Sequence, residues 1–126
     1  MTTQATTVRR RVSDLQDWIT QGKILEAMTE FYAPDVAMQE NAKAPTLGLA
    51  PNIEREKQFL AFVKEWKGYT VKSIAVDEPS GVATVENVIE FISVQDQPVR
   101  MEQVSVQRWR DGKIVHERFY YDTGNN

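Results

Sequence analysis

Cysteine is absent from this chain of 126 residues, and His116 is its only histidine. The sequence therefore contains no disulfide framework, no cysteine zinc site, no iron–sulfur cluster and no thiol nucleophile. A metal site built on two histidines is excluded as well. From the residue types we expect neither a metal nor a cofactor. The lack of cysteine also fits a reducing compartment.

Long apolar runs and a strong charge of one sign are missing too. No window approaches the roughly 20 apolar residues that a membrane helix needs, and no run of signal-peptide type follows the arginines at 9–11. The 15 basic and 18 acidic residues give a net charge of −3, which argues against a nucleic-acid surface. We therefore expect a cytoplasmic protein that binds neither nucleic acid nor membrane.

The residues that are present are typical of a globular protein. Hydrophobic residues make up 41% and charged residues 26% of the chain. A chain of this length buries about two-thirds of its unfolded surface, which is enough for one core. No repeat or linker interrupts it, so we expect residues 1–126 to form a single domain.

The first half of the sequence has a helical period. Apolar residues spaced three and four apart predict a first helix, with its face at Val8, Val12, Leu15 and Ile19. The spacing resumes over residues 24–31, with a bend near Gly22 and an end before Pro34. A third helix is predicted from Asn52 as N-cap to Lys67, with Gly68 just after it.

The second half alternates with a period of two, which is typical of strands. The predicted strands are 36–40, which is short, and then 69–76, 82–94, 99–110 and 113–122. Residues 78–81 suit a type I turn, and Asp111-Gly112 is a strong hairpin signal. Helices followed by an antiparallel meander indicate the α+β class. We predict a cone in which three N-terminal helices pack in the concavity of a strongly curved sheet and leave a cavity.

Three segments carry a family resemblance that spans nearly the whole chain. They are Gly22-Lys23-Ile24-Leu25-Glu26-Ala27-Met28, Phe31-Tyr32-Ala33-Pro34-Asp35-Val36, and the closing hairpin from Arg110 to Val115 with Arg118 to Asp122. In this order they resemble the nuclear transport factor 2-like superfamily, which includes SnoaL-like polyketide cyclases, ketosteroid isomerase and limonene epoxide hydrolase. The resemblance implies the cystatin-like cone fold, but the fold hosts enzymes and non-enzymes alike.

The resemblance also suggests which residues to test for chemistry. Glu40 matches the position of the isomerase's general base, at the end of the short strand. The isomerase's oxyanion donors are not matched, because their positions hold Leu15 or Gln16 and Ser105. The hydrolase's last-strand aspartate is replaced by Phe119, and its Arg–Asp pair is not visible. Steroid isomerisation and epoxide hydrolysis are therefore both disfavoured.

Alternation divides the side chains of each strand between two faces, and the resemblance to the isomerase and the hydrolase implies which face is inward. On the last two strands it places Met101, Gln103, Ser105, Gln107, Glu117, Phe119 and Tyr121 toward the cavity. On the long strand we favour Glu86, Val88, Glu90 and Ile92, although a slip of one residue would invert this assignment. The candidate catalytic residues are Glu40, Glu117, Tyr121 and Gln103. The candidate pocket residues are Trp18, Met38, Phe59, Val63, Val88, Glu90, Met101, Ser105 and Phe119.

Two functional hypotheses follow. In the first, a SnoaL-like protein binds a small hydrophobic molecule, with Glu40 as a base whose pKa is raised by burial and Tyr121 or Gln103 polarising a carbonyl oxygen. In the second, the same fold is a non-catalytic ligand-binding or dimerisation module. We also expect a homodimer through the outward sheet face, where Val104, Val106, Ile114 and Tyr120 form an apolar strip.

Overall fold

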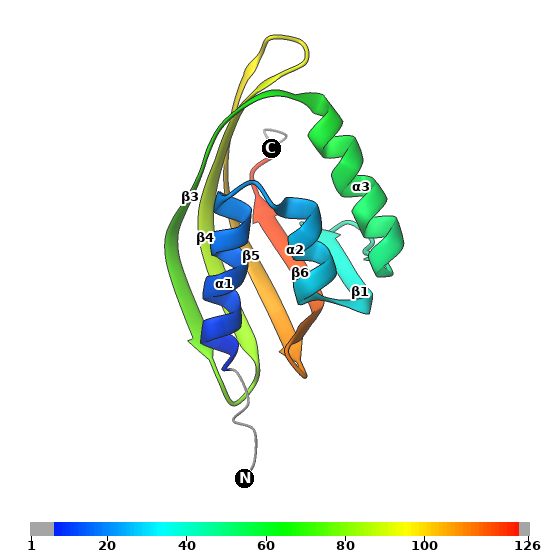
Figure 1. Cartoon of the computed structure of the whole chain (residues 1–126), viewed down its shortest axis with the longest axis vertical. Coiled ribbons are helices and arrows are strands. Elements are labelled where there is room, and N and C mark those ends of the chain that lie inside the picture. Colours follow the sequence, from blue (N-terminus) through cyan, green and yellow to red (C-terminus); the bar gives the residue numbers. More distant parts are fainter. Residues whose placement is uncertain (1–6, 124–126) are drawn as a thin grey trace.

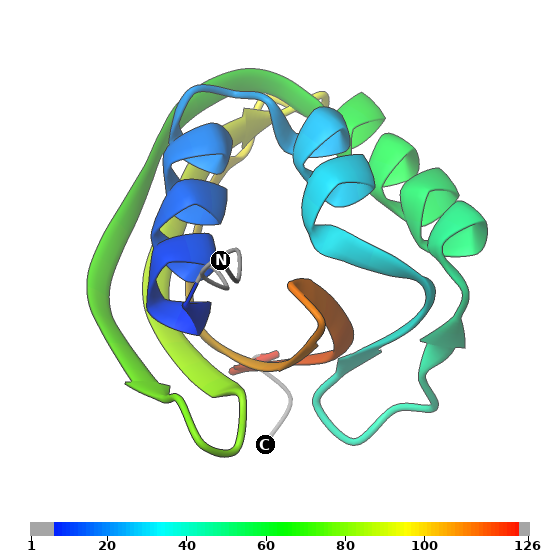
Figure 2. The ribbon, with the colours of Figure 1, turned by 60° about the horizontal axis from the view of Figure 1, so that its bottom comes forward.

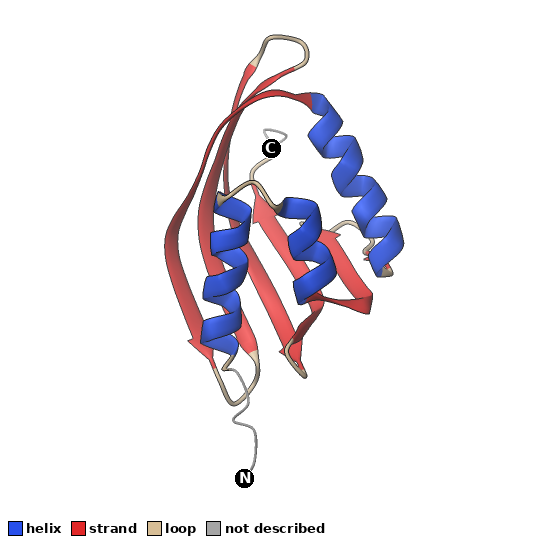
Figure 3. Cartoon of the chain, viewed as in Figure 1, coloured by secondary structure: helices blue, strands red, loops and turns tan. Residues whose placement is uncertain are grey.

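The computed structural model describes residues 7–123. Within them lie three helices and six strands, shown in Figures 1 and 3. The elements in chain order are α1 (Val8–Thr20), α2 (Ile24–Phe31), β1 (Tyr32–Glu40), β2 (Thr46–Leu47), α3 (Leu49–Phe62), β3 (Val63–Asp77), β4 (Val82–Ser93), β5 (Pro98–Arg110) and β6 (Lys113–Tyr121).

The strands form one curved, unclosed sheet in the order β2-β1-β6-β5-β4-β3. All neighbouring strands are antiparallel except β1 and β6, which run parallel. The sheet bends around α1 and α2, and α3 lies beside α2 at the β1 end (Figure 2). The predicted α+β cone, with three helices in the concavity of an antiparallel meander, is confirmed.

The first two helices follow the apolar spacing of the sequence. The Thr7 side chain caps α1 by accepting a hydrogen bond from the Arg10 amide at 3.1 Å. Val12 and Leu15 are buried on its inner face, as are Met28 and Phe31 on α2. The core continues onto the sheet through Val36, Val85, Trp109 and Ile114. No helix among residues 7–123 is long and apolar enough to cross a membrane.

The third helix is displaced from its predicted position. It begins at Leu49, with Gly48 as its N-cap, and ends at Phe62. Asn52 is therefore not the cap: its buried side chain donates hydrogen bonds to the Thr46 carbonyl at 3.0 Å and to the Gly48 carbonyl at 2.8 Å. These bonds link β2, whose residues were predicted to lie in a loop, to the start of the helix.

Trp66 and Gly68, predicted at the end of that helix, lie on β3 instead. The reason is tertiary, because the start of β3 pairs with the end of β4 and so extends the chain immediately after the helix. Trp66 stacks on Phe91 with ring centroids 6.2 Å apart. Gly68 sits next to a register shift in the strand pair rather than at a helix terminus. Strand pairing has overridden local helix propensity here.

The turn between β3 and β4 contains a glycine whose position leaves no room for a side chain. Gly81 has φ +72°, and a Cβ built on it would lie 2.6 Å from the Trp109 carbonyl oxygen. Gly112, in the hairpin that Asp111-Gly112 was predicted to form, has φ +77° but open space around the same position. The two glycines thus share a backbone conformation and differ in contact.

We expect Gly81→Ala to lower the free energy of unfolding by about 2 kcal/mol or more, because the left-handed backbone alone costs an L-residue about 1–2 kcal/mol. The backbone clash with Trp109 adds to that cost. Gly112→Ala is the matched control and should show the backbone cost only. Urea denaturation followed by tryptophan fluorescence measures both. Equal losses for the two variants would contradict the role given to the Trp109 contact.

Candidate functional site

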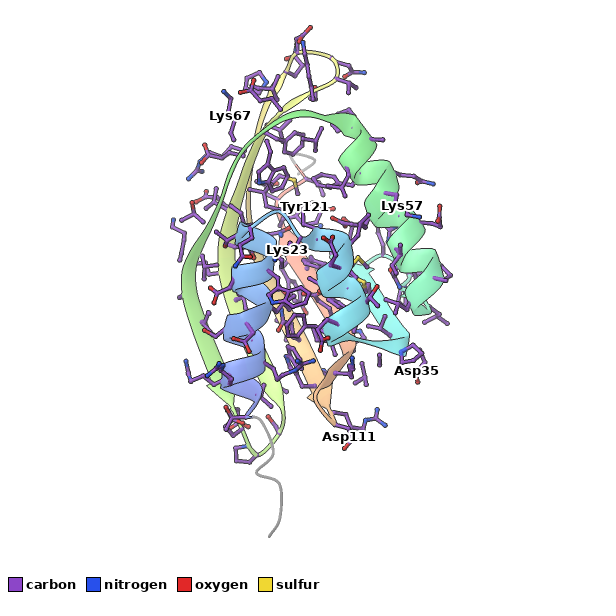
Figure 4. All side chains as sticks on the ribbon, viewed as in Figure 1. Lys23, Asp35, Lys57, Lys67, Asp111 and Tyr121 are labelled. Atoms are coloured by element: carbon purple, nitrogen blue, oxygen red, sulfur yellow. The ribbon has the colours of Figure 1, made fainter. Side chains whose placement is uncertain are left out.

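A cavity of about 230 Å³ lies between the helices and the concave face of the sheet. Its wall is mostly apolar and aromatic, with polar groups contributed by α1, α3 and the central strands. The lining residues are Leu15, Gln16, Ile19, Ile24, Ala27, Met28, Tyr32, Met38, Gln39, Glu40, Asn52, Arg55, Glu56, Phe59, Trp66, Tyr69, Asn87, Ile89, Met101, Gln103, Ser105, Gln107, Glu117 and Phe119. Figure 4 shows the side chains of the described residues on the ribbon.

Glu117 is the most deeply buried carboxylate of the cavity, with only 2% of its surface exposed. It accepts hydrogen bonds from the Ser105 hydroxyl at 2.6 Å, from Gln107 Nε2 at 3.2 Å and from the Tyr32 hydroxyl. Trp109 Nε1 in turn donates to Gln107 Oε1 at 3.0 Å. Burial raises the pKa of Glu117 and outweighs the three hydrogen bonds, which act to lower it.

Glu40 lies at the rim, where its environment differs. Tyr121 donates a hydrogen bond to it at 2.7 Å, and the Arg55 guanidinium binds its other oxygen. Partial burial acts to raise the pKa of Glu40, but the Tyr121 hydrogen bond and the Arg55 charge outweigh it, so the pKa is lowered. The expectation that burial raises this pKa is therefore wrong, because the sequence did not reveal that Arg55 of α3 reaches β1.

Glu56 is a third carboxylate at the cavity, and it is not among the site residues predicted from sequence. Burial raises the pKa of Glu56 to about 7, with the negative charges of Glu117 and Glu40 adding to the effect. It lies on the inner face of α3, four residues after Asn52 and three before Phe59. That spacing is a sequence signal, since Phe59 was already expected at the pocket.

The structure brings together many of the residues proposed from sequence. Met38, Glu40, Phe59, Met101, Gln103, Ser105, Glu117 and Phe119 all line the cavity. Tyr121 is directly opposite Gln103 in the β5–β6 pair. Tyr121, labelled in Figure 4, lies at the end of β6 beyond the lining residues. Its hydroxyl donates a hydrogen bond to Glu40.

The remaining proposed pocket residues lie elsewhere. Trp18 packs edge-on against Phe31 in the core, with centroids 5.3 Å apart, and Val63 lies at the junction of α3 and β3. Val88 and Glu90 belong to the outward face of β4, together with Glu86. The assignment of the even-numbered residues of β4 to the cavity is therefore wrong.

Register explains this reversal. Residues directly opposite each other in an antiparallel pair share a face. Asn87 pairs with Gln103 and Ile89 with Met101, so the inward face of β5 places the odd-numbered residues of β4 inward. A second reversal affects Ile114, which was expected outside. Val115 is an extra residue between two ladder pairs, and this bulge turns Ile114 into the core.

Tyr69, Gln16 and Asn87 add further polar groups to the cavity wall. The Tyr69 hydroxyl donates to Gln16 Oε1. Asn87 is 2% exposed, and its Oδ1 has no hydrogen-bond partner among the described residues. Within residues 7–123 no three acidic or histidine side chains converge in a way that could hold a metal ion.

The chain belongs to the SnoaL-like polyketide cyclases, whose family model matches residues 6–124. No curated protein matches the chain at a significant level.

Three solved structures illustrate the range of similar proteins. One, from Mesorhizobium loti and assigned as a SnoaL-like polyketide cyclase, is 22% identical with a TM-score of 0.77, covering 92% of this chain and all of that one. An NTF2-like protein of unknown function from Burkholderia pseudomallei is 14% identical with a TM-score of 0.80, covering 94% and 93%. An LEH-like epoxide hydrolase from M. tuberculosis is 14% identical with a TM-score of 0.74, covering 94% and 84%. Identities this low show a shared fold.

Proposed function

We propose that this protein binds a small, largely apolar molecule in the cone cavity and moves a proton on it, with Glu56 as the proton acceptor. The observation that carries the proposal is the carboxylate of Glu56 at an apolar cavity wall, with no hydrogen bond or ion pair to another side chain among residues 7–123. A general base works best when its pKa lies near the ambient pH, and a pKa of about 7 meets that condition.

The other two carboxylates are less suited to the same task. Glu117 is held by three donors and is closed off from a ligand on those sides. Glu40 is the base favoured by family resemblance, but its ion pair with Arg55 lowers its pKa and its basicity. Glu40 and Arg55 would instead shape the mouth of the cavity. Gln103, which lines the cavity, is the candidate to polarise a carbonyl oxygen.

The proposed step removes a proton from a carbon next to a carbonyl group. The proton passes to the Glu56 carboxylate, and the C–H electron pair moves into an enolate. Reprotonation at the same or another carbon completes the cycle and frees the base. Isomerisation and ring closure both begin with such a step, which suits the chemistry named by the family.

We expect the wild-type protein to speed the exchange of α-protons of cyclohexanone or acetophenone in D₂O, followed by proton NMR. Glu56→Gln should slow that exchange by at least about tenfold, since it removes the base and keeps the shape. Glu54→Gln is the matched control, because this glutamate lies exposed on the same helix.

The same measurement separates the alternatives. Loss of exchange in Glu40→Gln but not in Glu56→Gln would return the base to Glu40. Binding of the ketones without any exchange by the wild type would favour a non-catalytic ligand-binding module. That second function has one observation in its favour: the hydroxyl groups of Tyr32, Ser105 and Tyr69 are already engaged by protein acceptors.

We further propose that the protein forms a homodimer through the convex face of the sheet. Val104, Val106 and Tyr120 give this face its apolar centre, and Tyr120 is 43% exposed. Arg108 and Arg118 lie on the same face toward one end of β5, and Glu102 lies toward the other. A two-fold axis would set opposite charges against each other and bury the apolar centre.

We expect Val104→Asp combined with Val106→Asp to convert a dimer into a folded monomer, as judged by sedimentation velocity and circular dichroism. Charges placed in an apolar interface oppose association far more than folding. Val94→Asp is the control, since Val94 is 53% exposed beyond the end of β4. A wild type that sediments as a monomer would contradict this interface.

A further inference from the structure

The strong hydrogen-bond donors of the cavity wall are already in use. Three hydroxyl groups and one guanidinium donate to acceptors of the protein itself, namely those of Tyr32, Ser105, Tyr69 and Arg55. Breaking any of these bonds for a ligand would leave a protein acceptor unpaired, which costs free energy. An oxygen atom of a ligand must therefore find its donors among the other groups of the wall.

Asn87 of β4 has a donor that the protein does not use. The residue is 2% exposed, and its Oδ1 is fully buried without a hydrogen-bond partner among residues 7–123. Its Nδ2 donates to no group of the described residues either, yet this atom is not enclosed as Oδ1 is. Because Asn87 lines the cavity, the accessible N–H group is the one that a ligand can reach.

Gln103 of β5 provides a second donor beside the first. It lies directly opposite Asn87 in the β4–β5 pair and also lines the cavity. Its side-chain amide has no hydrogen-bond partner among the described residues. Gln16 of α1 also has an unused amide nitrogen, its oxygen being bound by Tyr69, but only Asn87 and Gln103 are joined by strand pairing.

The strand register brings the two amides within reach of one oxygen atom. Residues directly opposite each other share a face, with Cβ atoms about 4.5–5.5 Å apart. One oxygen that lies about 3 Å from two nitrogen atoms requires these nitrogen atoms to be within about 6 Å of each other. The side chains of Asn87 and Gln103 are long enough and flexible enough at their ends to meet that condition.

The charges of the cavity favour an uncharged oxygen. Among the described lining residues, the carboxylates of Glu40, Glu56 and Glu117 outnumber the one cationic side chain, that of Arg55. A ligand that enters as a carboxylate would meet their repulsion, whereas a ketone brings its oxygen without a charge. Fixed amide N–H groups then stabilise the negative charge where it develops, during the reaction itself.

We infer that Asn87 and Gln103 together form a cradle for the carbonyl oxygen of the ligand, which makes Asn87 a catalytic residue. The inference rests on the proposed function, in which Gln103 polarises this oxygen and Glu56 accepts the proton. When the C–H bond breaks, its electron pair moves into the enolate and negative charge gathers on the oxygen that both amides hold. Glu56 is neutral once it carries the proton and no longer opposes that charge.

A catalytic role also explains a polar side chain at this buried strand position. A buried acceptor without a donor costs free energy, and asparagine is depleted in strands. Leucine reproduces the branched shape of asparagine without its polar atoms. We therefore expect Asn87→Leu to raise the urea midpoint of unfolding above that of the wild type, whereas an asparagine with a structural role would lose stability on the same change.

Acetophenone labelled with ¹³C at its carbonyl carbon tests the cradle by NMR, because hydrogen bonds to the oxygen move this resonance downfield. We expect the ketone bound to the wild type to resonate downfield of the ketone bound to Asn87→Leu or to Gln103→Met. Both variants should also slow α-proton exchange by at least about tenfold. Gln97→Met is the matched control, since this exposed glutamine lies just before β5.

Glu56→Gln separates the cradle from the base. This variant should keep the carbonyl resonance of the wild type, because both amides remain, and should lose the exchange. If it keeps both the resonance and the exchange rate, the base is assigned wrongly and the cradle stands. Circular dichroism shows that each variant is folded.

Three results would overturn the cradle and leave the small-molecule cavity in place. One is a carbonyl resonance that Asn87→Leu leaves unchanged, and another is a lower urea midpoint for this variant than for the wild type. The third is benzoate that binds as tightly as acetophenone, which would indicate a site for an ionised oxygen. If a folded wild type does not bind acetophenone at all, the proposed small-molecule site fails together with the cradle.

Discussion

Glu117→Ala is expected to lower the free energy of unfolding by about 3 kcal/mol or more. The substitution leaves Tyr32, Ser105 and Gln107 without the acceptor to which they donate. Each buried donor left unsatisfied costs about 1–3 kcal/mol. The lost side chain also leaves a void beneath the cavity floor, which adds to the cost.

Urea denaturation at pH 6 measures this effect. Glu117→Gln should lose less stability than Glu117→Ala. The carbonyl oxygen of the glutamine still accepts a hydrogen bond, whereas its NH₂ group cannot accept from the remaining donors. Glu90→Ala removes an exposed glutamate from the convex face and should change stability by no more than about 0.5 kcal/mol. A loss below 1 kcal/mol for Glu117→Ala would show that the network around Glu117 does not stabilise the fold.

Glu56→Gln is expected to stabilise the protein at pH 8 by up to about 3 kcal/mol, and to have little effect at pH 4. The folded protein holds the proton of Glu56 with a pKa of about 7, above the value of 4.5 for an ordinary glutamate. The unfolded chain thus releases this proton more readily. The favourable contribution is fully present below pH 4.5 and is lost as the pH rises through 7.

The measurement is urea denaturation of both proteins at pH 4, 6 and 8. At pH 4 a protonated glutamate and a glutamine are nearly equivalent, so the difference should vanish. Glu54→Gln, on the exposed side of the same helix, should show no such trend. A wild type more stable than Glu56→Gln at pH 8 would mean that the carboxylate is ionised and satisfied in the fold.

The substitutions at Glu117 and Glu56 test two different roles of a carboxylate at the cavity. Glu117 is a buried carboxylate that three donors orient, and it organises the interior of the sheet. Glu56 is a carboxylate to which no side chain of residues 7–123 donates a hydrogen bond. Buried polar groups with complete networks stabilise a fold, whereas incomplete ones mark places where a ligand is expected. We therefore assign the chemistry to Glu56 and the architecture to Glu117.

Local sequence was sufficient for most elements of the fold. The helical spacing of Val12, Leu15 and Met28 and the turn at Asp111-Gly112 depend on neighbours in the chain, and the structure contains them as predicted. Alternation on β5 and β6 placed Met101 and Gln103 on one face of β5 and Glu117 on one face of β6, and the family resemblance identified these faces as the inward ones. These features are local because a period or a turn is set within a few residues.

Long-range strand pairing decided the features of the fold that local sequence did not predict. The register of β4 against β5 placed Asn87 in the cavity, and one bulge residue, Val115, moved Ile114 into the core. Pairing of β3 with β4 ended α3 at Phe62, ahead of its predicted end. Alternation cannot fix such features, since a shift of one residue inverts a strand and carries no local signal.

Long-range packing also decided the pKa values of Glu40 and Glu56. Sequence placed Glu40 correctly at the end of β1, but only the packing of α3 against β1 brings Arg55 to it and lowers its pKa. The same packing turns Glu56 toward Glu117. A pKa depends on burial and on charges that are distant in sequence. The sequence therefore determined the cone and several residues of its wall, whereas the tertiary structure decided which carboxylate holds a proton near neutral pH.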